Sequence, residues 1–456
     1  MHTIIRGVES INKLLSTKYS DNKQYIPSAY VLRYEIDNIL LLCNTMTGEV
    51  ALLSESEKEL FNNLPLNTSN DSQNLAGLLY HGFVVPNTCD EAKRCDQLKS
   101  VFLHKDAAKG IINNYNILPT TGCNARCFYC YESNIKHINM SDDTASCLVD
   151  FIANHHGDKK VNISWFGGEP TLGVRQINYI SDKLSQLNIP FRSEMVSNGY
   201  LFDHNLVKHA KSCWHLDLIQ ITLDGTEDVY NHTKAYITIT DNAYRRVLRN
   251  IQLFLDEGIN VNIRLNMDNH NDHNLEMLID ELADRFKGEK RLAVYVRLLK
   301  ENAGFSPIKH TADDKHRLRD RYLRIQNRLE KNGWSQIWRF EIPRLRTFSC
   351  MADNPCAIQC TPDGILGKCE DHIYDHTVGT LLEGVTKSSE IDWWKQRITL
   401  KDCPGCVLYP SCVHLLKHCP TRFTECDLEE KHQRIQLCYI KMIEAYEKWK
   451  DNNSKA

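Results

Sequence analysis

The stretch Thr121-Gly-Cys-Asn-Ala-Arg-Cys-Phe-Tyr-Cys130 decides how the rest of the chain is interpreted. It carries three cysteines in CxxxCxxC spacing, directly after an apolar run: Cys123, Cys127 and Cys130. Three thiolates on one short loop can hold three irons of a cubane cluster and leave the fourth iron without a protein ligand. Such an open iron suits a cluster that binds and reduces another molecule. A structural zinc site is the alternative, but it usually needs four ligands, and the nearest further ligand, His137, is a weak one.

Outward from this loop, apolar runs alternate with amphipathic helical patterns. The predicted strands are Asn116–Thr121, Val161–Phe166, Phe191–Val196, Leu216–Leu223, Asn260–Met267 and Leu292–Leu298. The predicted helices between them include Asp142–His155, Asp203–Cys213, Ala243–Glu257 and Asn274–Phe286. Six strand–helix units predict an α/β fold with a parallel sheet, either open or curved into a partial (β/α)6 TIM-like barrel.

Short polar and glycine-rich motifs follow four of the predicted strands. They are Thr121-Gly-Cys, Gly167-Gly-Glu-Pro, Ser197-Asn-Gly and Asp224-Gly. In folds of this kind the site lies at the carboxyl ends of the strands. The sequence therefore predicts one functional site, built from these four motifs at one edge of the sheet.

Together these words resemble the radical S-adenosylmethionine (radical SAM) superfamily over roughly residues 115–300. The cysteine loop has an aromatic residue, Tyr129, before its last cysteine, and Trp165-Phe-Gly-Gly-Glu-Pro170 resembles the GGE motif of that family. The resemblance implies that a 4Fe–4S cluster is held by Cys123, Cys127 and Cys130. It also implies that S-adenosylmethionine is bound by Tyr129, Gly167, Gly168, Glu169, Ser197, Asn198 and Asp224.

The resemblance further implies the chemistry. Reductive cleavage of S-adenosylmethionine would give a 5′-deoxyadenosyl radical, which abstracts a hydrogen atom from the substrate. The cofactor supplies this reaction, while the protein orients it and excludes water.

Many of the 18 cysteines gather in a dense block between Cys350 and Cys426. In a reducing cytosol, clustered cysteines indicate metal or redox sites rather than disulfides. The words Cys350-x13-Gly-x4-Cys369 and Cys403-Pro-Gly-Cys406-x5-Cys412 resemble the SPASM domain, which holds two auxiliary 4Fe–4S clusters. The resemblance implies an inner cluster on Cys350, Cys356, Cys369 and Cys419. It implies an outer cluster on Cys403, Cys406, Cys412 and Cys426.

The tail departs from that family in one place, since six residues separate Cys412 from Cys419 where the family has three. Cys360 can replace Cys356, and Cys438 can replace Cys426, although Cys438 lies in the helical pattern Ile435–Trp449. Two zinc knuckles are the structural alternative for the whole tail.

Enzymes that resemble this layout act on peptides or protein side chains. We expect a maturase of a ribosomally made precursor peptide that forms a thioether or carbon–carbon cross-link. The alternative is an oxidase of the anaerobic sulfatase-maturing kind, in which an aspartate directly follows the cysteine equivalent to Cys369. Here the run is Cys369-Glu-Asp-His, so Glu370 or Asp371 can deprotonate a substrate or simply form an acidic surface pair.

The chain divides into four expected parts: an accessory domain at 1–110, the barrel at 111–310, a helical linker at 311–345 and the cluster-binding domain at 346–456. Short strand patterns in Tyr30–Leu53, followed by Ser54 and Glu57 in capping-box spacing, suggest a winged-helix-like accessory domain. Its hairpin would offer an edge strand to the precursor peptide.

Composition sets the remaining expectations. The 456 residues carry a net charge of −3 with both signs interspersed, which gives no reason to expect a nucleic acid or a membrane as partner. No apolar run approaches the ~20 residues of a membrane span, and no secretory signal is visible. We expect a cytoplasmic enzyme that receives electrons from a small donor such as flavodoxin or ferredoxin. A non-catalytic zinc or iron–sulfur scaffold is the remaining alternative, although it would need neither the Gly167-Gly-Glu word nor an open cysteine loop.

Overall fold

The computed structural model describes most of the chain. The described residues are 2–6, 24–65, 72–107, 109–238, 241–268, 271–299, 312–334, 341–348, 350–398, 400–412, 417–419, 426 and 428–454. Parts of the predicted accessory domain and linker, at 7–23 and 335–340, lie outside them.

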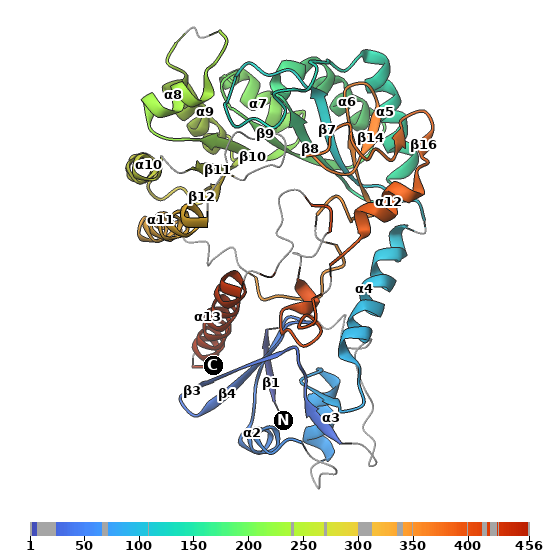
Figure 1. Cartoon of the computed structure of the whole chain (residues 1–456), viewed down its shortest axis with the longest axis vertical. Coiled ribbons are helices and arrows are strands. Elements are labelled where there is room, and N and C mark those ends of the chain that lie inside the picture. The colour runs from blue at the N-terminus through green and yellow to red at the C-terminus, as the bar shows by residue number, and fades with distance from the viewer. Residues whose placement is uncertain are drawn as a thin grey trace.

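The centre of the molecule is a sheet of parallel strands covered by helices (Figure 1). Its strands are β7 (Asn114–Thr120), β8 (Val161–Gly167), β9 (Phe191–Ser197), β10 (Leu216–Leu223), β11 (Asn260–Met267) and β12 (Leu292–Leu298). Each pairs in parallel with the next in chain order. The predicted partial barrel is confirmed, and three of its strands have the predicted bounds.

Helices follow the strands because amphipathic segments with good N-caps lie between them. They are α5 (Asp142–His155), α6 (Val174–Gln186), α7 (His204–Ser212), α8 (Glu227–Lys234), α9 (Ala243–Asp256), α10 (Asp272–Arg285) and α11 (Ala312–Lys331), with a 3-10 turn η1 (Pro170–Gly173). Ser141, Asp203 and Asn242 each accept a hydrogen bond from a first-turn backbone N–H, which satisfies an otherwise unpaired donor. Their apolar faces bury side chains such as Trp165 and Trp214 in one continuous core.

The tail continues the barrel sheet, which the sequence did not reveal. Strand β13 (Ala357–Cys360) pairs in parallel with β7, and β14 (Ile365–Gly367), β15 (Gly379–Thr380) and β16 (Gly384–Val385) extend the sheet to ten strands. The tail also holds α12 (Ser388–Lys395), a 3-10 turn η3 (Tyr409–Ser411) and the long α13 (Leu428–Asn453). Hydrogen bonding to β7 therefore anchors the first tail cysteines to the barrel.

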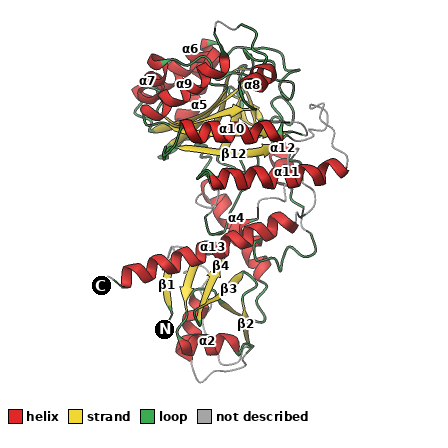
Figure 2. Ribbon diagram, turned by 90° about the vertical axis from the view of Figure 1, so that its left-hand side faces the viewer, coloured by secondary structure: helices red, strands yellow, loops and turns green. Residues whose placement is uncertain are grey.

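The N-terminal part lies at the end of the molecule away from the barrel helices (Figures 1 and 2). It has an antiparallel sheet of β1 (Thr3–Arg6), β5 (Glu49–Leu52), β4 (Ile39–Asn44) and β3 (Val31–Ile36), and a small ladder of β2 (Tyr25–Pro27) and β6 (Val84–Pro86). Helices α2 (Glu55–Asn62), α3 (Ser72–Tyr80) and α4 (Glu91–Ala107) complete it. The expected capping pattern is present, because Glu57 accepts hydrogen bonds from the backbone N–H and hydroxyl of Ser54.

Helix α13 lies across the N-terminal sheet (Figure 2). The buried side chains of Leu41, Cys43 and Val50 form one core with Cys438 and Met442. The two ends of the chain thus share a hydrophobic core, so the accessory domain is joined to the tail rather than tethered loosely to the barrel.

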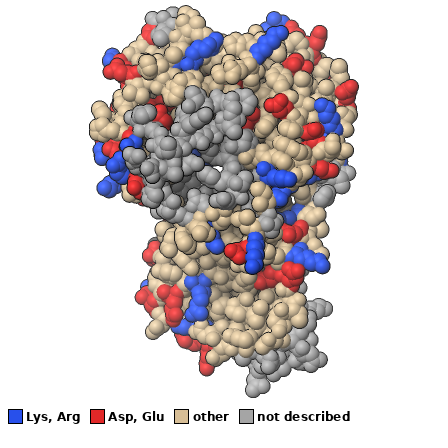
Figure 3. Space-filling model, viewed as in Figure 1, with Lys and Arg blue, Asp and Glu red and all other residues tan. Residues whose placement is uncertain are grey.

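The surface seen in Figure 3 mixes the two signs of charge over its described residues. This agrees with the interspersed charges of the sequence. None of the described helices combines the length and the apolar character that a bilayer crossing requires.

Candidate functional site

The cysteine loop after β7 lies directly on the Gly167-Gly168 turn after β8. A Cβ atom at Gly168 would stand 2.2 Å from the carbonyl oxygen of Gly122. Gly167 has a φ of +101°, and a Cβ there would stand 2.3 Å from the carbonyl oxygen of Thr120. Only glycine permits so close a backbone approach. The two glycines therefore fix the height of the cysteine loop above the sheet.

Glu169 braces the loops that follow β8 and β9. Its side chain is fully buried and accepts hydrogen bonds from the Ser197 hydroxyl at 2.8 Å and the Asn198 backbone N–H at 2.8 Å. The hydroxyl and N–H of Thr171 donate to the same carboxylate. Burial raises the pKa of Glu169, although these hydrogen bonds oppose the shift. The structure thus joins Glu169, Ser197 and Asn198 in one network, as the sequence predicted for a common site.

Tyr129 and Asp224 also meet, and a residue that the sequence did not single out joins them. The Tyr129 hydroxyl donates to the Asp224 carboxylate at 2.8 Å, and Lys234 Nζ lies 3.0 Å from Asp224 Oδ2. Both side chains of the ion pair are almost completely buried. Burial alone would lower the pKa of Lys234, but the Asp224 carboxylate raises it above its usual value. Since the Arg126 N–H also donates to the Lys234 carbonyl at 2.8 Å, Lys234 ties the cysteine loop to α8.

Removing Lys234 should therefore destabilise the protein strongly. In Lys234→Met, Asp224 would remain as an uncompensated buried carboxylate, which typically costs about 3–5 kcal/mol. We expect a correspondingly lower urea midpoint, followed by circular dichroism. The double variant Lys234→Met with Asp224→Asn should recover part of the loss because no unpaired charge remains. A single variant as stable as the natural protein would contradict the role of the pair.

The three thiols of the loop are close enough to influence one another. The charge of Cys127 acts on both Cys123 and Cys130, and all three side chains are only partly exposed. Burial raises the pKa of Cys123 to about 12 and of Cys130 to about 11. Iron binding would therefore release protons from them. The Ala125 N–H points at the Cys123 sulfur at 3.4 Å, a hydrogen bond of the kind that tunes cluster potentials.

Within the described residues, no three Cys, His, Asp or Glu side chains are arranged to hold a single metal ion. Three neighbouring thiols on one loop, with backbone N–H groups beside them, match the donor set of a cubane cluster.

In the tail, Cys350, Cys356 and Cys369 gather at one place. The charge of Cys350 acts on Cys369. The charges of Cys350 and Cys356 both act on the buried Lys368. Cys360 instead lies fully buried in the barrel core. This arrangement favours Cys356 over Cys360 as a member of the inner set.

The inner set lies at the amino end of the barrel strands, opposite the cysteine loop. Ala357 pairs with Asn114 at the start of β7, and β14 runs back antiparallel to β13. A strand of 7 residues such as β7 spans about 20 Å. The first cysteine loop and the inner set therefore flank the barrel from its two ends.

The outer set consists of Cys403, Cys406, Cys412 and either Cys426 or Cys438, and the environments of the last two differ. The charges of Cys403, Cys406 and Cys412 act on Cys426. Cys438 is instead buried beside Cys43 in the core under α13. The structure therefore favours Cys426 over Cys438.

The two residues before Cys419 hold this part of the tail against α12 and the residue after it. The Lys417 N–H donates to the Gln396 carbonyl at 2.9 Å, and the His418 ring stacks on Trp393 at 3.8 Å. The contact of Cys419 with the inner set stays a prediction.

Glu370 and Asp371 reach an acidic group that includes a third residue, Glu132, two positions after Cys130. Burial, together with the charges of Glu370 and Asp371, raises the pKa of Glu132 to about 7. Glu370 retains access to solvent, but the surrounding protein desolvates its carboxyl and raises its pKa to about 7. Arg264 on β11 acts on it in the opposite direction. Glu370 and Asp371, which follow Cys369, therefore lie close to Glu132, which follows Cys130, within the barrel.

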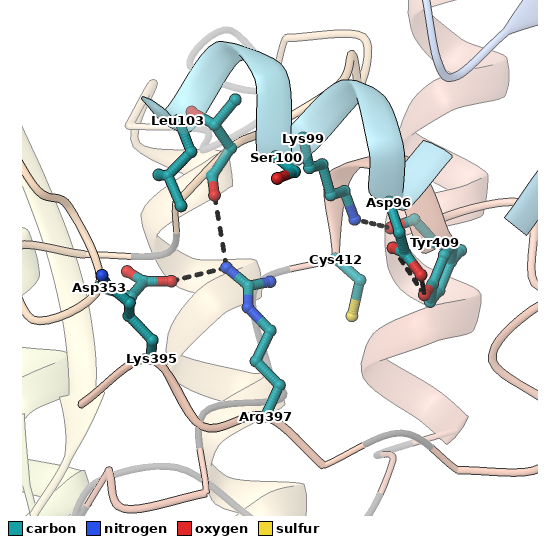
Figure 4. Close-up of a pocket in the computed structure, with 10 residues that line it drawn as sticks. Asp96, Lys99, Ser100, Leu103, Asp353, Lys395, Arg397, Tyr409 and Cys412 are labelled. Carbon is teal, nitrogen blue, oxygen red and sulfur yellow. Dashed lines mark hydrogen bonds and ion pairs between the residues drawn. The ribbon is translucent and has the colours of Figure 1, made fainter. Parts of the chain in front are cut away.

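A cavity of about 230 Å³ lies between α4 and the tail (Figure 4). From α4, Lys99 donates to the Tyr409 carbonyl at 3.0 Å, while the Tyr409 hydroxyl donates to Asp96 at 2.9 Å. Arg397 bonds Asp353 at 2.7 Å on the opposite wall, and Cys412 lies between these two groups. Because Asp353 accepts from the Cys350 N–H, the cavity separates the inner set from the outer set.

Comparison with known proteins agrees with this geometry. Residues 117–282 match the model of the radical SAM superfamily. An uncharacterized protein of Methanocaldococcus jannaschii is 31% identical over 113 residues, which cover 24% of this chain and 37% of that protein. The match thus spans well under half of that relative.

Two solved structures share the fold over most of this chain. The anSMEcpe structure with bound AdoMet has a TM-score of 0.54 at 16% identity, over 73% of this chain and 99% of that one. Streptococcus suis SuiB bound to the precursor peptide SuiA has a TM-score of 0.51 at 14% identity, over 88% and 99% of the two chains. At these identities the likeness is one of fold.

Proposed function

Because residues 117–282 form a radical SAM domain, we propose that the chain is a radical SAM peptide maturase with two auxiliary clusters in a SPASM-type tail. It would join two residues of a precursor peptide through a thioether or carbon–carbon bond. The observation that carries this proposal is the placement of two cysteine sets at opposite ends of one barrel, with carboxyl groups between them.

The residues that would hold the cofactors follow from the geometry. The loop cysteines Cys123, Cys127 and Cys130 would bind the cluster that contacts S-adenosylmethionine, and the two tail sets would bind the auxiliary clusters. When bound, these groups supply a 5′-deoxyadenosyl radical for hydrogen abstraction and a sink for the electron that substrate oxidation releases. A small donor such as flavodoxin or ferredoxin would provide the reducing electron.

The chain itself contributes position and proton transfer. Gly167 and Gly168 fix the cysteine loop, and the network around Glu169 holds the adjacent turns in place. Cross-linking removes two hydrogen atoms from the peptide, of which the second leaves as a proton and an electron. Glu370 has a raised pKa and contact with solvent, as a general base for that proton requires.

The accessory domain supplies an edge for the peptide. Strand β3 is the last strand of its sheet among the described residues. A two-residue turn, Asp37-Asn38, with positive φ at both positions makes Ile36 and Ile39 a hydrogen-bonded pair. The N–H groups of Arg33 and Glu35 then point away from β4, towards the open edge. An extended leader peptide can add there as a further strand.

A substitution on this edge tests peptide binding without disturbing the shared core. Arg33→Pro removes one outward N–H, and proline is tolerated on edge strands. We expect the affinity for the leader peptide to fall about tenfold, or ~1.4 kcal/mol, as measured by fluorescence anisotropy. Arg33→Ala is the matched control, since it keeps the N–H and should bind as the natural protein does. Equal affinities of the two variants would argue against strand addition.

The alternative is a protein side-chain oxidase of the sulfatase-maturing kind. One observation favours the peptide maturase: the SuiB fold covers 88% of this chain against 73% for anSMEcpe. Both of those proteins were solved with a bound peptide. Incubation with small peptides encoded near the gene should yield a product lighter by two hydrogen atoms, with a new bond located by fragmentation. A product in which one side chain alone is oxidised would favour the alternative.

A further inference from the structure

Lys368 is a buried lysine in the wall of the inner cysteine set. Only 5% of its surface is exposed, and it directly precedes Cys369. Its Nζ donates to the carbonyl oxygens of Asn354 and Ala357, each at 2.6 Å. These carbonyls flank Cys356, so the lysine fastens the loop of one predicted ligand to the strand end that carries another.

The ammonium group has one donor more than these contacts use. A lysine carries three N–H donors, and two go to carbonyl oxygens. In the described part of the chain, the structure records no further hydrogen bond from this nitrogen. The thiols of Cys350 and Cys356 lie close enough to act on its charge. A buried donor without an acceptor is costly, which indicates that its acceptor is a group among these cysteines.

Among the described residues, Asp353 is the carboxylate whose charge acts on Lys368. The nearby carboxylate of Asp353 bonds Arg397 at 2.7 Å and accepts from the Cys350 N–H at 3.0 Å. One carboxylate thus stands against the buried Lys368 and against Arg397, whose side chain is 30% exposed. Buried charges are normally paired, and a cluster with four thiolate ligands carries a net negative charge that grows on reduction. Such a cluster would supply the missing balance.

We infer that Lys368 is a tuning residue of the inner auxiliary cluster, to which it donates its third N–H and whose reduced form its charge stabilises. This inference rests on the proposed function, in which Cys350, Cys356 and Cys369 hold that cluster. Hydrogen bonds to the sulfurs and local charge both set the potential of an iron–sulfur cluster. Lys368 therefore makes this cluster a better acceptor for the electron that leaves the substrate.

Redox titration followed by electron paramagnetic resonance tests the inference. The full-length chain is used with the loop ligands removed, so that all signals come from the tail: Cys123→Ala, Cys127→Ala and Cys130→Ala. In this background Lys368→Met should make reduction of one auxiliary cluster at least tenfold less favourable, a shift of about 59 mV to lower potential. Lys368→Gln, which keeps an N–H donor without the charge, should give a smaller shift in the same direction. The second auxiliary cluster should be unaffected.

Lys395→Met is the matched control. The charge of this lysine also acts on Lys368, but its side chain is 35% exposed and lies beside Asp392. Its removal should leave both potentials nearly unchanged. Unchanged potentials in a fully loaded Lys368→Met would overturn the inference. Loss of about four irons from both Lys368 variants would also overturn it, since the role would then be architectural. A background protein that holds no iron at all would instead refute the cluster assignment, independently of Lys368.

Discussion

The Cys127→Ala variant is expected to release no 5′-deoxyadenosine above the level seen without enzyme. Cys127 is the middle one of the three proposed loop ligands, and its charge acts on both Cys123 and Cys130. Two remaining thiols cannot hold a site-differentiated cubane in the way that three do. We expect a loss of about a thousandfold or more, equivalent to about 4 kcal/mol of activation free energy, measured by chromatography after anaerobic incubation with dithionite.

Cys147→Ala is the control for that experiment. Cys147 is a partly buried cysteine of α5 that belongs to none of the three cysteine sets. Its removal should leave 5′-deoxyadenosine release close to that of the natural protein. Activity retained by Cys127→Ala, with four irons still bound in the loop, would refute the role assigned to that residue.

The second large effect is expected from Gly168→Ala. The added methyl group would stand 2.2 Å from the carbonyl oxygen and 2.6 Å from the carbonyl carbon of Gly122. These are backbone atoms, so relief requires that the cysteine loop itself moves. Overpacking of this kind costs about 1–3 kcal/mol, and a displacement of ~1 Å at a reacting centre can cost about 10²-fold in rate. We expect the rate of 5′-deoxyadenosine release to fall by that order, with iron content reduced less.

Gly405→Ala serves as the comparison for this glycine. Gly405 lies between Cys403 and Cys406. Among the described residues, apart from its two chain neighbours, none has an atom within 4 Å of the position where its Cβ would stand. Its variant should release 5′-deoxyadenosine normally. If Gly168→Ala were equally active, the close approach of the two loops would not matter for the reaction.

Much of the barrel could be predicted because its signals are local. Strands such as Leu216–Leu223 and Asn260–Met267 alternate apolar with polar residues, and the structure has them at the predicted bounds. The polar words after the strands met at one edge because parallel strands bring their carboxyl ends together. Hence Glu169 contacts Ser197 and Asn198, and Tyr129 contacts Asp224, across 28 to 95 residues of sequence.

What the sequence did not reveal depends on contacts without a local signal. The pairing of β13 with β7 joins segments more than two hundred residues apart through a strand of only 4 residues. Lys234 and Lys368 lie outside the sequence motifs that indicated the site. Their roles arise because folding buries their charged groups. Glu132 could have been noticed from its position two residues after Cys130. The choices between Cys356 and Cys360, and between Cys426 and Cys438, needed the three-dimensional environment of each thiol.

The most direct test of the whole account is an iron count combined with cofactor cleavage. The protein would be purified anaerobically, reconstituted with iron and sulfide, and incubated with S-adenosylmethionine and dithionite. We expect about twelve irons per chain, four for each cubane, together with release of 5′-deoxyadenosine. Zinc in place of iron and no cleavage of S-adenosylmethionine would contradict it.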